Sequence, residues 1–151
     1  MDIRTRYLVA ASADVDLIAE NPHQPERWPG FACMNLDLEK LVDLLALSLG
    51  QPLNGELIQS FEVLNQASVH GPWLIRLPGA LCSALVGLDD AARGALALQW
   101  SGADSFKGAP WSSDDLRTAL KHLGALAQLA QERNENVLLY QGFDGEPVVV
   151  G

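Results

Sequence analysis

Histidine, carboxylate and serine side chains are the groups in this sequence that could perform acid–base, metal-binding or nucleophilic chemistry. The three histidines, His23, His70 and His122, are too far apart for a local metal motif, which places two histidines on adjacent turns of one helix. The sequence contains neither the Gly-x-Ser-x-Gly elbow of hydrolases nor a glycine-rich phosphate loop ending in Lys-Ser or Lys-Thr. We therefore predict no catalytic residue, cofactor or metal site, although a triad assembled from distant segments remains an open alternative.

Two pairs of adjacent carboxylates, Asp89-Asp90 and Asp114-Asp115, could suggest acid–base catalysis or a divalent cation. Both pairs lie where a predicted helix begins, and there a carboxylate can accept hydrogen bonds from backbone N–H groups that lack a helical partner. The alternating acidic residues of a calcium-binding loop are absent from the sequence. We therefore interpret both pairs as helix caps.

Two tryptophans lie in segments rich in proline and glycine, and acidic residues flank them. The candidate partner-binding residues are Glu26, Trp28, Asp104, Trp111, Asp114 and Asp115. Tryptophan is enriched at binding hot spots, and an aromatic ring among carboxylates suits a basic, arginine-rich protein through cation–π contacts and ion pairs. In the alternative interpretation, both rings fold inward and anchor their loops to the core, as large aromatic side chains usually do.

The overall charge is acidic, with 19 acidic and 10 basic residues and a formal net charge of −9. Such a surface repels nucleic acid and anionic lipid, so we expect neither a nucleic-acid partner nor a membrane. It attracts a basic protein, or alternatively serves solubility alone. The N-terminal residues lead into only five apolar residues, 7–11, which is too few for a signal-peptide core. We therefore expect a cytoplasmic protein.

The length of 151 residues and the 48% hydrophobic content predict one globular domain over residues 1–151. Cys33 and Cys82 each lie in an apolar stretch. In a cytoplasmic chain we expect both cysteines to be buried, unpaired and chemically inert. The sequence contains no internal repeat that would mark a domain boundary.

The spacing of apolar residues predicts helices and strands in mixed order. The predicted strands, the last two joined by a turn at Asp144-Gly145, are residues 5–11, 73–77, 137–143 and 148–150. The predicted helices are residues 13–20, 38–49, 79–86, 90–100 and 113–132. Residues 54–69 suit a helix and a strand equally well, and both alternatives stay open. The pattern predicts an α+β domain with several helices packed on a small, mainly antiparallel sheet.

Capping residues support the helix boundaries. Ser12, Asp37 and Asp89 are candidate N-caps, Pro78 is a candidate first helical residue, and Ser112 with Asp115 resembles a capping box. The longest helix carries one apolar stripe for the core. Its members are Leu116, Ala119, Leu120, Leu123, Leu126, Ala127 and Ala130.

The segment Asn35-Leu36-Asp37-Leu38-Glu39-Lys40 resembles the Leu-Asp-Ile-Asp-Lys signature of the YfbM-like bacterial family, a domain of unknown function. Later features follow in a similar order: a Trp-Leu-x-x-Leu-Pro stretch at 73–78, a short helix, a second helix after Leu88-Asp89, a loop with an aromatic residue, a long helix and a closing strand. The family's tryptophan and histidine in the helix after the signature are replaced here by residues 41–47. The resemblance implies an α+β domain and no established enzymatic activity.

These observations favour a non-enzymatic, acidic binding protein. Its most specific form is an immunity protein that neutralises a bacterial toxin, such as a basic nuclease or a nucleotide-modifying enzyme, by covering its surface. The alternative is a small enzyme or ligand-binding domain, with segments 21–36 and 101–112 as the walls of its pocket. A self-associating structural protein is a third interpretation.

Overall fold

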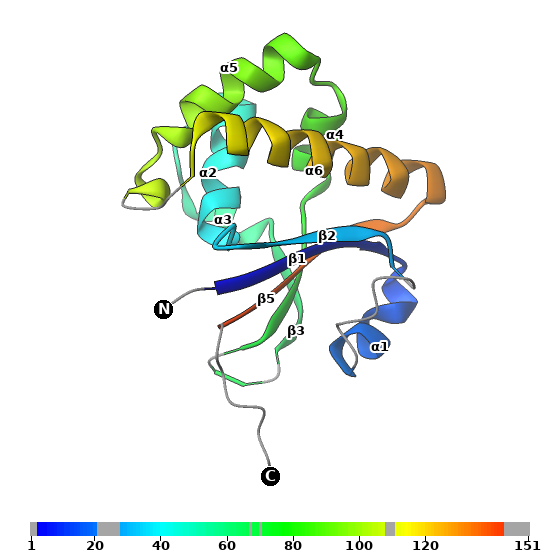
Figure 1. Cartoon of the computed structure of the whole chain (residues 1–151). Helices are drawn as coiled ribbons and strands as arrows, with labels where there is room; N and C mark the ends of the chain where they lie inside the picture. The colour runs from blue at the N-terminus through cyan, green and yellow to red at the C-terminus, as the bar shows by residue number, and fades with distance from the viewer. Residues whose placement is uncertain (1–2, 21–27, 67, 70, 108–110, 144–151) are drawn as a thin grey trace.

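The computed structural model of the chain describes residues 3–20, 28–66, 68–69, 71–107 and 111–143. In this part of the chain, six α-helices, two short 3-10 helices and five β-strands form a layer of helices over an antiparallel sheet (Figure 1). The predicted α+β fold, with several helices on a small, mainly antiparallel sheet, is confirmed. Every helix in these residues is too short or too polar to cross a bilayer.

The sheet has the strand order β2-β1-β5-β4-β3, and each neighbouring pair is antiparallel. The strands are β1 (Ile3–Ala10), β2 (Gly30–Met34), β3 (Glu62–Gln66), β4 (Trp73–Arg76) and β5 (Asn136–Phe143). β1 and β5 pair along their whole lengths, so strands from opposite ends of the described chain form the centre of the sheet. β2 and β3 are the two edges.

The helices cover the two faces of the sheet unequally. The helices are α1 (Val15–Glu20), α2 (Leu38–Leu49), α3 (Gly55–Gln59), α4 (Gly79–Val86), α5 (Asp90–Ser101) and α6 (Ser113–Arg133), with 3-10 turns at Ser12–Asp14 and Asp104–Phe106. In Figure 1, α2, α4, α5 and α6 lie on one side of the sheet, and α1 lies on the other. The seven predicted apolar positions of α6 are all buried, which confirms its core-facing stripe.

Alternation along the strands divides the apolar residues between two cores, because successive side chains of a strand point to opposite faces. On β1, Tyr7 and Val9 join the large core under α2, α4, α5 and α6. Leu8 and Ala10 join a smaller core that includes Ile18 of α1. The helical layer is therefore fixed to one face of the sheet, and α1 closes part of the other.

Several expected helix caps are confirmed. The side chain of Asp89 accepts a hydrogen bond from the Ala92 N–H at 2.7 Å. Ser112 and Asp115 form both bonds of the capping box. A further cap, at the end of α2, is formed by Gly50 in the left-handed conformation, with φ of 64°, a geometry that favours glycine.

Other expected caps are corrected. The side chain of Ser12 caps no helix, because it lies within a 3-10 turn and its Oγ accepts a hydrogen bond from Asn136 Nδ2 at 3.0 Å. Asp37 occupies the N-cap position of α2, but its side chain does not cap. Pro78 is the N-cap of α4 rather than its first helical residue.

The ambiguous segment 54–69 contains both alternatives in succession, since α3 is followed directly by β3. Strand β2 was not expected from the sequence. The expected turn at Asp144-Gly145 and the expected strand at 148–150 lie outside the described residues.

Candidate functional site

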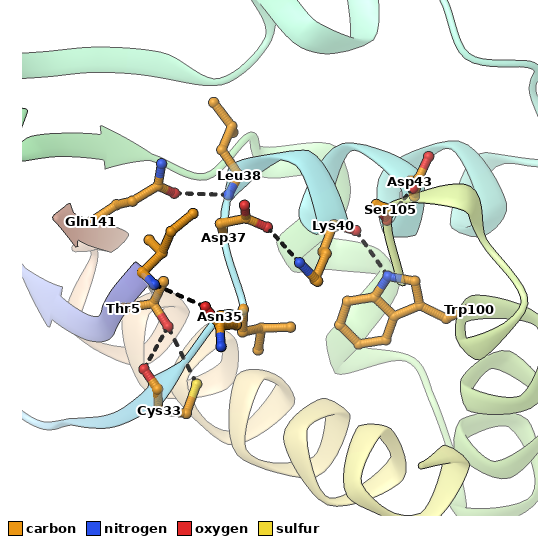
Figure 2. Close-up of polar contacts among 12 residues, drawn as sticks. Thr5, Cys33, Asn35, Asp37, Leu38, Lys40, Asp43, Trp100, Ser105 and Gln141 are labelled. Atoms are coloured by element: carbon orange, nitrogen blue, oxygen red, sulfur yellow. Dashed lines mark hydrogen bonds and ion pairs between the residues drawn. The ribbon is translucent and has the colours of Figure 1, made fainter. Parts of the chain in front are cut away.

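The junction between β2 and α2 is held by an unusual number of polar contacts (Figure 2). Asn35 adopts a left-handed conformation with φ of 65°. Its N–H donates to the Ile3 carbonyl at 2.7 Å, and its Oδ1 accepts from the Ile3 N–H at 2.8 Å. The hydroxyl of Tyr7 donates to the Leu36 carbonyl. These bonds fix the end of β2 relative to the centre of the sheet.

The start of α2 is capped from the sheet rather than by its own first residue. Gln141 of β5 accepts a hydrogen bond from the Leu38 N–H through Oε1, at 2.8 Å. Asp37 instead pairs with Lys40, whose Nζ lies 3.1 Å from Asp37 Oδ1. Both residues are buried, Asp37 with 8% and Lys40 with 7% of its surface exposed. Because the two charges neutralise each other and are buried, this ion pair fixes the position of the helix and cannot contact a binding partner.

A groove of about 520 Å³ runs beside this junction, between β2 and the first half of α6. One wall is formed by residues 31–35, and the other is formed by Trp111, Asp115, Thr118, Ala119 and His122. We call this feature the β2–α6 groove. It is the place where the structure brings together residues that are about eighty positions apart in sequence.

Aromatic rings form part of both walls of the β2–α6 groove. The ring of Phe31 stacks on the buried ring of Tyr7, with centroids 5.2 Å apart and planes inclined by 20°. On its other side the Phe31 ring lies 5.3 Å from the ring of His122. Trp111 is half-buried and packs against the main core. The groove therefore offers a partly apolar surface.

The charge of the groove comes from α6. Among the groove-lining residues that the structure describes, Asp115 is the one acidic residue, and none is a lysine or an arginine. Asp115 Oδ2 accepts a hydrogen bond from the Ser112 N–H at 3.2 Å. Asp114 is exposed on the same turn. The groove is consequently acidic at one end.

The cations on the same half of α6 lie near α5 instead. The pKa of Asp90 in α5 is lowered, first by its hydrogen bond to Arg93 and by the charge of that residue, and further by the charges of Arg117 and Lys121. Arg117 and Lys121 therefore lie close to the start of α5, and neither lines the β2–α6 groove.

The two cysteines are free and half-buried. Cys33 lies in the wall of the groove, and burial raises the pKa of its thiol despite a lowering contact with the Thr5 hydroxyl. Burial also raises the pKa of Cys82 to about 11. Since the thiolate is the reactive form, both thiols are weakly nucleophilic at neutral pH.

The six candidate partner-binding residues fall in different places. Trp28 is buried, with 4% of its surface exposed, and its Nε1 donates to Asp14 Oδ2 at 3.3 Å in the small core. This is the inward-folded arrangement of the alternative interpretation. Asp104 is exposed in the second 3-10 turn, away from the groove lining. Glu26 lies outside the described residues.

The groove brings together Trp111 and Asp115, with Asp114 beside them. His122 joins them, whereas His23 and His70 lie outside the described residues.

The wall contributed by β2 was missed in the sequence. The short apolar run Phe31-Ala32-Cys33-Met34 is the signal that could have revealed it, because a run of this length between turn residues is consistent with a strand.

Comparisons with known protein families, curated proteins and solved structures find no match to this chain. The YfbM-like resemblance therefore stays an expectation. In the described residues, no group of three or more His, Cys, Asp or Glu side chains is arranged to hold a metal ion.

A second hollow, of about 600 Å³, lies between the start of α4 and the end of α6. Its walls include Arg76, Pro78 and Glu135. Arg76 forms an ion pair with Glu62 across β3 and β4, so its charge is compensated. This hollow has less aromatic surface than the β2–α6 groove, and the charge of its Arg76 is already neutralised. The β2–α6 groove is therefore the stronger candidate site.

Proposed function

We propose that this chain is a non-enzymatic, acidic binding protein that recognises a basic protein through the β2–α6 groove. The observation that carries the proposal is the combination of aromatic walls with a lining carboxylate and no lining lysine or arginine in the described residues. The net charge of −9 supports it, because an acidic field speeds the encounter with a basic partner.

In its most specific form, the partner is a bacterial toxin with a basic surface, and the protein acts as its immunity protein. Inhibition would follow from covering the toxin's surface, without chemistry on either molecule. The raised thiol pKa values and the compensated Asp37–Lys40 pair support this reading, because they leave few reactive groups for an enzymatic role.

Affinity capture from a cell extract, with the full chain as bait, tests the proposal. We expect a basic protein to be retained, and Trp111→Ala to weaken its binding by about thirtyfold, as for an aromatic hot spot. Asp115→Asn removes the charge but keeps an oxygen for the capping bond, and should weaken binding by roughly three- to tenfold.

Leu98→Ala is the matched control, because Leu98 is an exposed apolar residue of α5 outside the groove lining. It should bind like the original chain. Retention of no basic protein, or equal retention by all the variants, would contradict the proposal. For a captured nuclease, the complex should also show reduced nuclease activity, and an unchanged rate would exclude the immunity role.

The alternative of a small ligand-binding domain uses the same groove, and the groove's volume favours it, since small-molecule pockets span about 300 to 1,000 Å³. Residues 31–35 and Trp111, which come from the two segments expected as pocket walls, both line it. Thermal-shift screening with nucleotides, amino acids and sugars tests this alternative. A ligand that stabilises the original chain but not Trp111→Ala would support it.

A further inference from the structure

The two edges of the sheet differ in how well they are protected against pairing with another strand. Edge strands usually carry charged residues, prolines or bulges that prevent such pairing. β3 follows this rule, because it begins with Glu62 and its register shifts between Val63 and Asn65. β2 reads Gly-Phe-Ala-Cys-Met, without a charge or a proline, and pairs with β1 in an unbroken register. β2 is therefore the open edge.

The hydrogen bonds of β1 show which backbone groups of β2 point outward. The Val9 N–H donates to the Pro29 carbonyl at 2.9 Å, and the Asn35 N–H donates to the Ile3 carbonyl at 2.7 Å. In an antiparallel pair, every second residue of a strand exchanges backbone hydrogen bonds with the neighbouring strand. Counting from residues 29 and 35, the residues of β2 that bond to β1 are therefore 31 and 33. The N–H and C=O groups of Ala32 and Met34 consequently point away from β1.

No strand lies beyond β2 in the part of the chain that the structure describes. The β2–α6 groove opens at this strand, because its lining includes Ala32 and Met34 together with residues of the first half of α6. Ala32 is exposed and Met34 has 38% of its surface exposed. A groove between an open strand edge and a helix has the shape that an extended peptide fills when it adds a strand to a sheet.

We propose that the β2–α6 groove binds an extended, basic segment of the partner protein as an additional strand along β2. This inference rests on the proposed function and specifies how the partner is held. Affinity would come from main-chain hydrogen bonds to Ala32 and Met34, and specificity would come from the side chains that face α6.

Alternate residues of the added strand face α6, because successive side chains point to opposite sides. One such residue meets the rings of Phe31 and His122, whose centroids lie 5.3 Å apart, and an apolar or aromatic side chain suits that surface. The residue at the acidic end meets Asp115, whose Oδ1 has no hydrogen-bond partner among the described residues. A lysine or arginine suits that position, so the recognised pattern is an apolar and a basic residue two positions apart.

Selection from a phage-displayed library of random decapeptides on the full chain tests the inference. We expect enrichment of peptides with an apolar and a basic residue at alternate positions, free of proline between them. An enriched peptide is then synthesised in two forms, each N-methylated at every second backbone amide. The form whose methyl groups replace the N–H groups that face β2 should bind at least tenfold more weakly than the unmethylated peptide. Methylation in the other register, whose N–H groups point away from β2, is the matched control.

A substitution in β2 gives an independent measurement. Ala32→Pro removes an outward N–H without removing a bond to β1, a change that edge strands tolerate. It should weaken peptide binding at least tenfold, whereas Leu98→Ala, an exposed position outside the groove lining, should bind like the original chain. If Ala32→Pro fails to fold, the two N-methylated peptides decide the question alone.

The outcomes separate this inference from the proposed function. Basic peptides that bind equally with either methylation register would overturn strand addition and leave a basic partner in place. Enrichment of acidic peptides would overturn both, whereas enrichment of none would overturn strand addition alone. A dimer of the chain in sedimentation that Ala32→Pro dissociates would place a second copy on β2 and overturn the assignment to a partner segment.

Discussion

Lys40 Nζ lies 3.1 Å from Asp37 Oδ1 at the first turn of α2, and both side chains are nearly inaccessible to water. The same ammonium lies 5.4 Å from the centre of the Phe106 ring, and the Lys40 carbonyl accepts the indole N–H of Trp100 at 2.8 Å. The pair therefore joins the start of α2 to α5 and to the second 3-10 turn. Removing one member would leave the other charge buried without compensation.

We predict that Lys40→Met lowers the free energy of unfolding by about 3 to 5 kcal/mol, the usual effect of breaking a buried pair. Asp37→Asn should lower the free energy of unfolding by a similar amount. The double variant, Asp37→Asn with Lys40→Met, should lose clearly less than the sum of the two single variants, because no buried charge remains. Urea unfolding measures all three, and additive losses would show that the two residues do not interact.

Gly30 approaches β1 so closely that it has no room for a side chain. A Cβ at this position would lie 2.0 Å from the Tyr7 carbonyl oxygen and 2.9 Å from the Leu8 Cα. We predict that Gly30→Ala displaces β2 and lowers the thermal unfolding midpoint. Gly94→Ala in α5 is the matched control, because a Cβ there has no neighbour within 4 Å. That change should stabilise the chain by about 0.5 to 1 kcal/mol through helix propensity, and an equal response of both variants would contradict the prediction.

The capping box of α6 should contribute measurably to stability. The Ser112 Oγ accepts a hydrogen bond from the Asp115 N–H at 3.1 Å, and the reciprocal bond is 3.2 Å long. We predict that Ser112→Ala lowers the free energy of unfolding by about 1 kcal/mol. Ser113→Ala, one residue into the helix, is the control and should change it far less. Circular dichroism during urea unfolding compares the two, and a harmless Ser112→Ala would show that the box is dispensable.

The chain should lose stability in alkali through the buried Tyr7 and the half-buried Cys82. Burial raises the pKa of Tyr7 above its ordinary value of 10.0, with smaller contributions from Cys33 and Asp37. Burial raises the pKa of Cys82 from 9.0 to about 11. A group with a raised folded-state pKa stabilises the fold fully below its unfolded pKa, and this stabilisation is lost as the pH rises through the folded-state value.

We therefore predict that the urea midpoint falls between pH 9 and pH 11 through Cys82, and continues to fall above pH 10 through Tyr7. Cys82→Ala should flatten the first part of this dependence and Tyr7→Phe the second. The slope against pH is the quantity to compare, because either variant also changes packing. Unaltered slopes in both variants would mean that other groups govern alkaline unfolding.

Helices with strong local signals were predictable from the sequence. The expected bounds 38–49 and 79–86 are those observed for α2 and α4, and the expected 113–132 misses α6 by one residue. In each case an apolar pattern coincides with a start or stop residue, such as Ser112 or Gly50. A helix can be predicted from its local sequence where the local preference agrees with the packing of the whole fold.

Features that depend on distant residues were not predictable. Leu38 is capped by Gln141, which is 103 positions away, so no local pattern could indicate that Asp37 would not cap. Strand β2 is short and exists because β1 pairs with it. The β2–α6 groove depends on that pairing, and for this reason Trp111 and Asp115 were identified singly but not as parts of one surface.

The central position of β5 has a consequence for the newly made chain. Until residues 136–143 leave the ribosome, β1 with β2 and β4 with β3 are two separate ribbons that share no backbone hydrogen bond in the sheet. The edges of β1 and β4 that pair with β5 stay without that partner until β5 is made, and contacts over such long sequence separations form slowly. The sheet can therefore close only after residues 136–143 have been made.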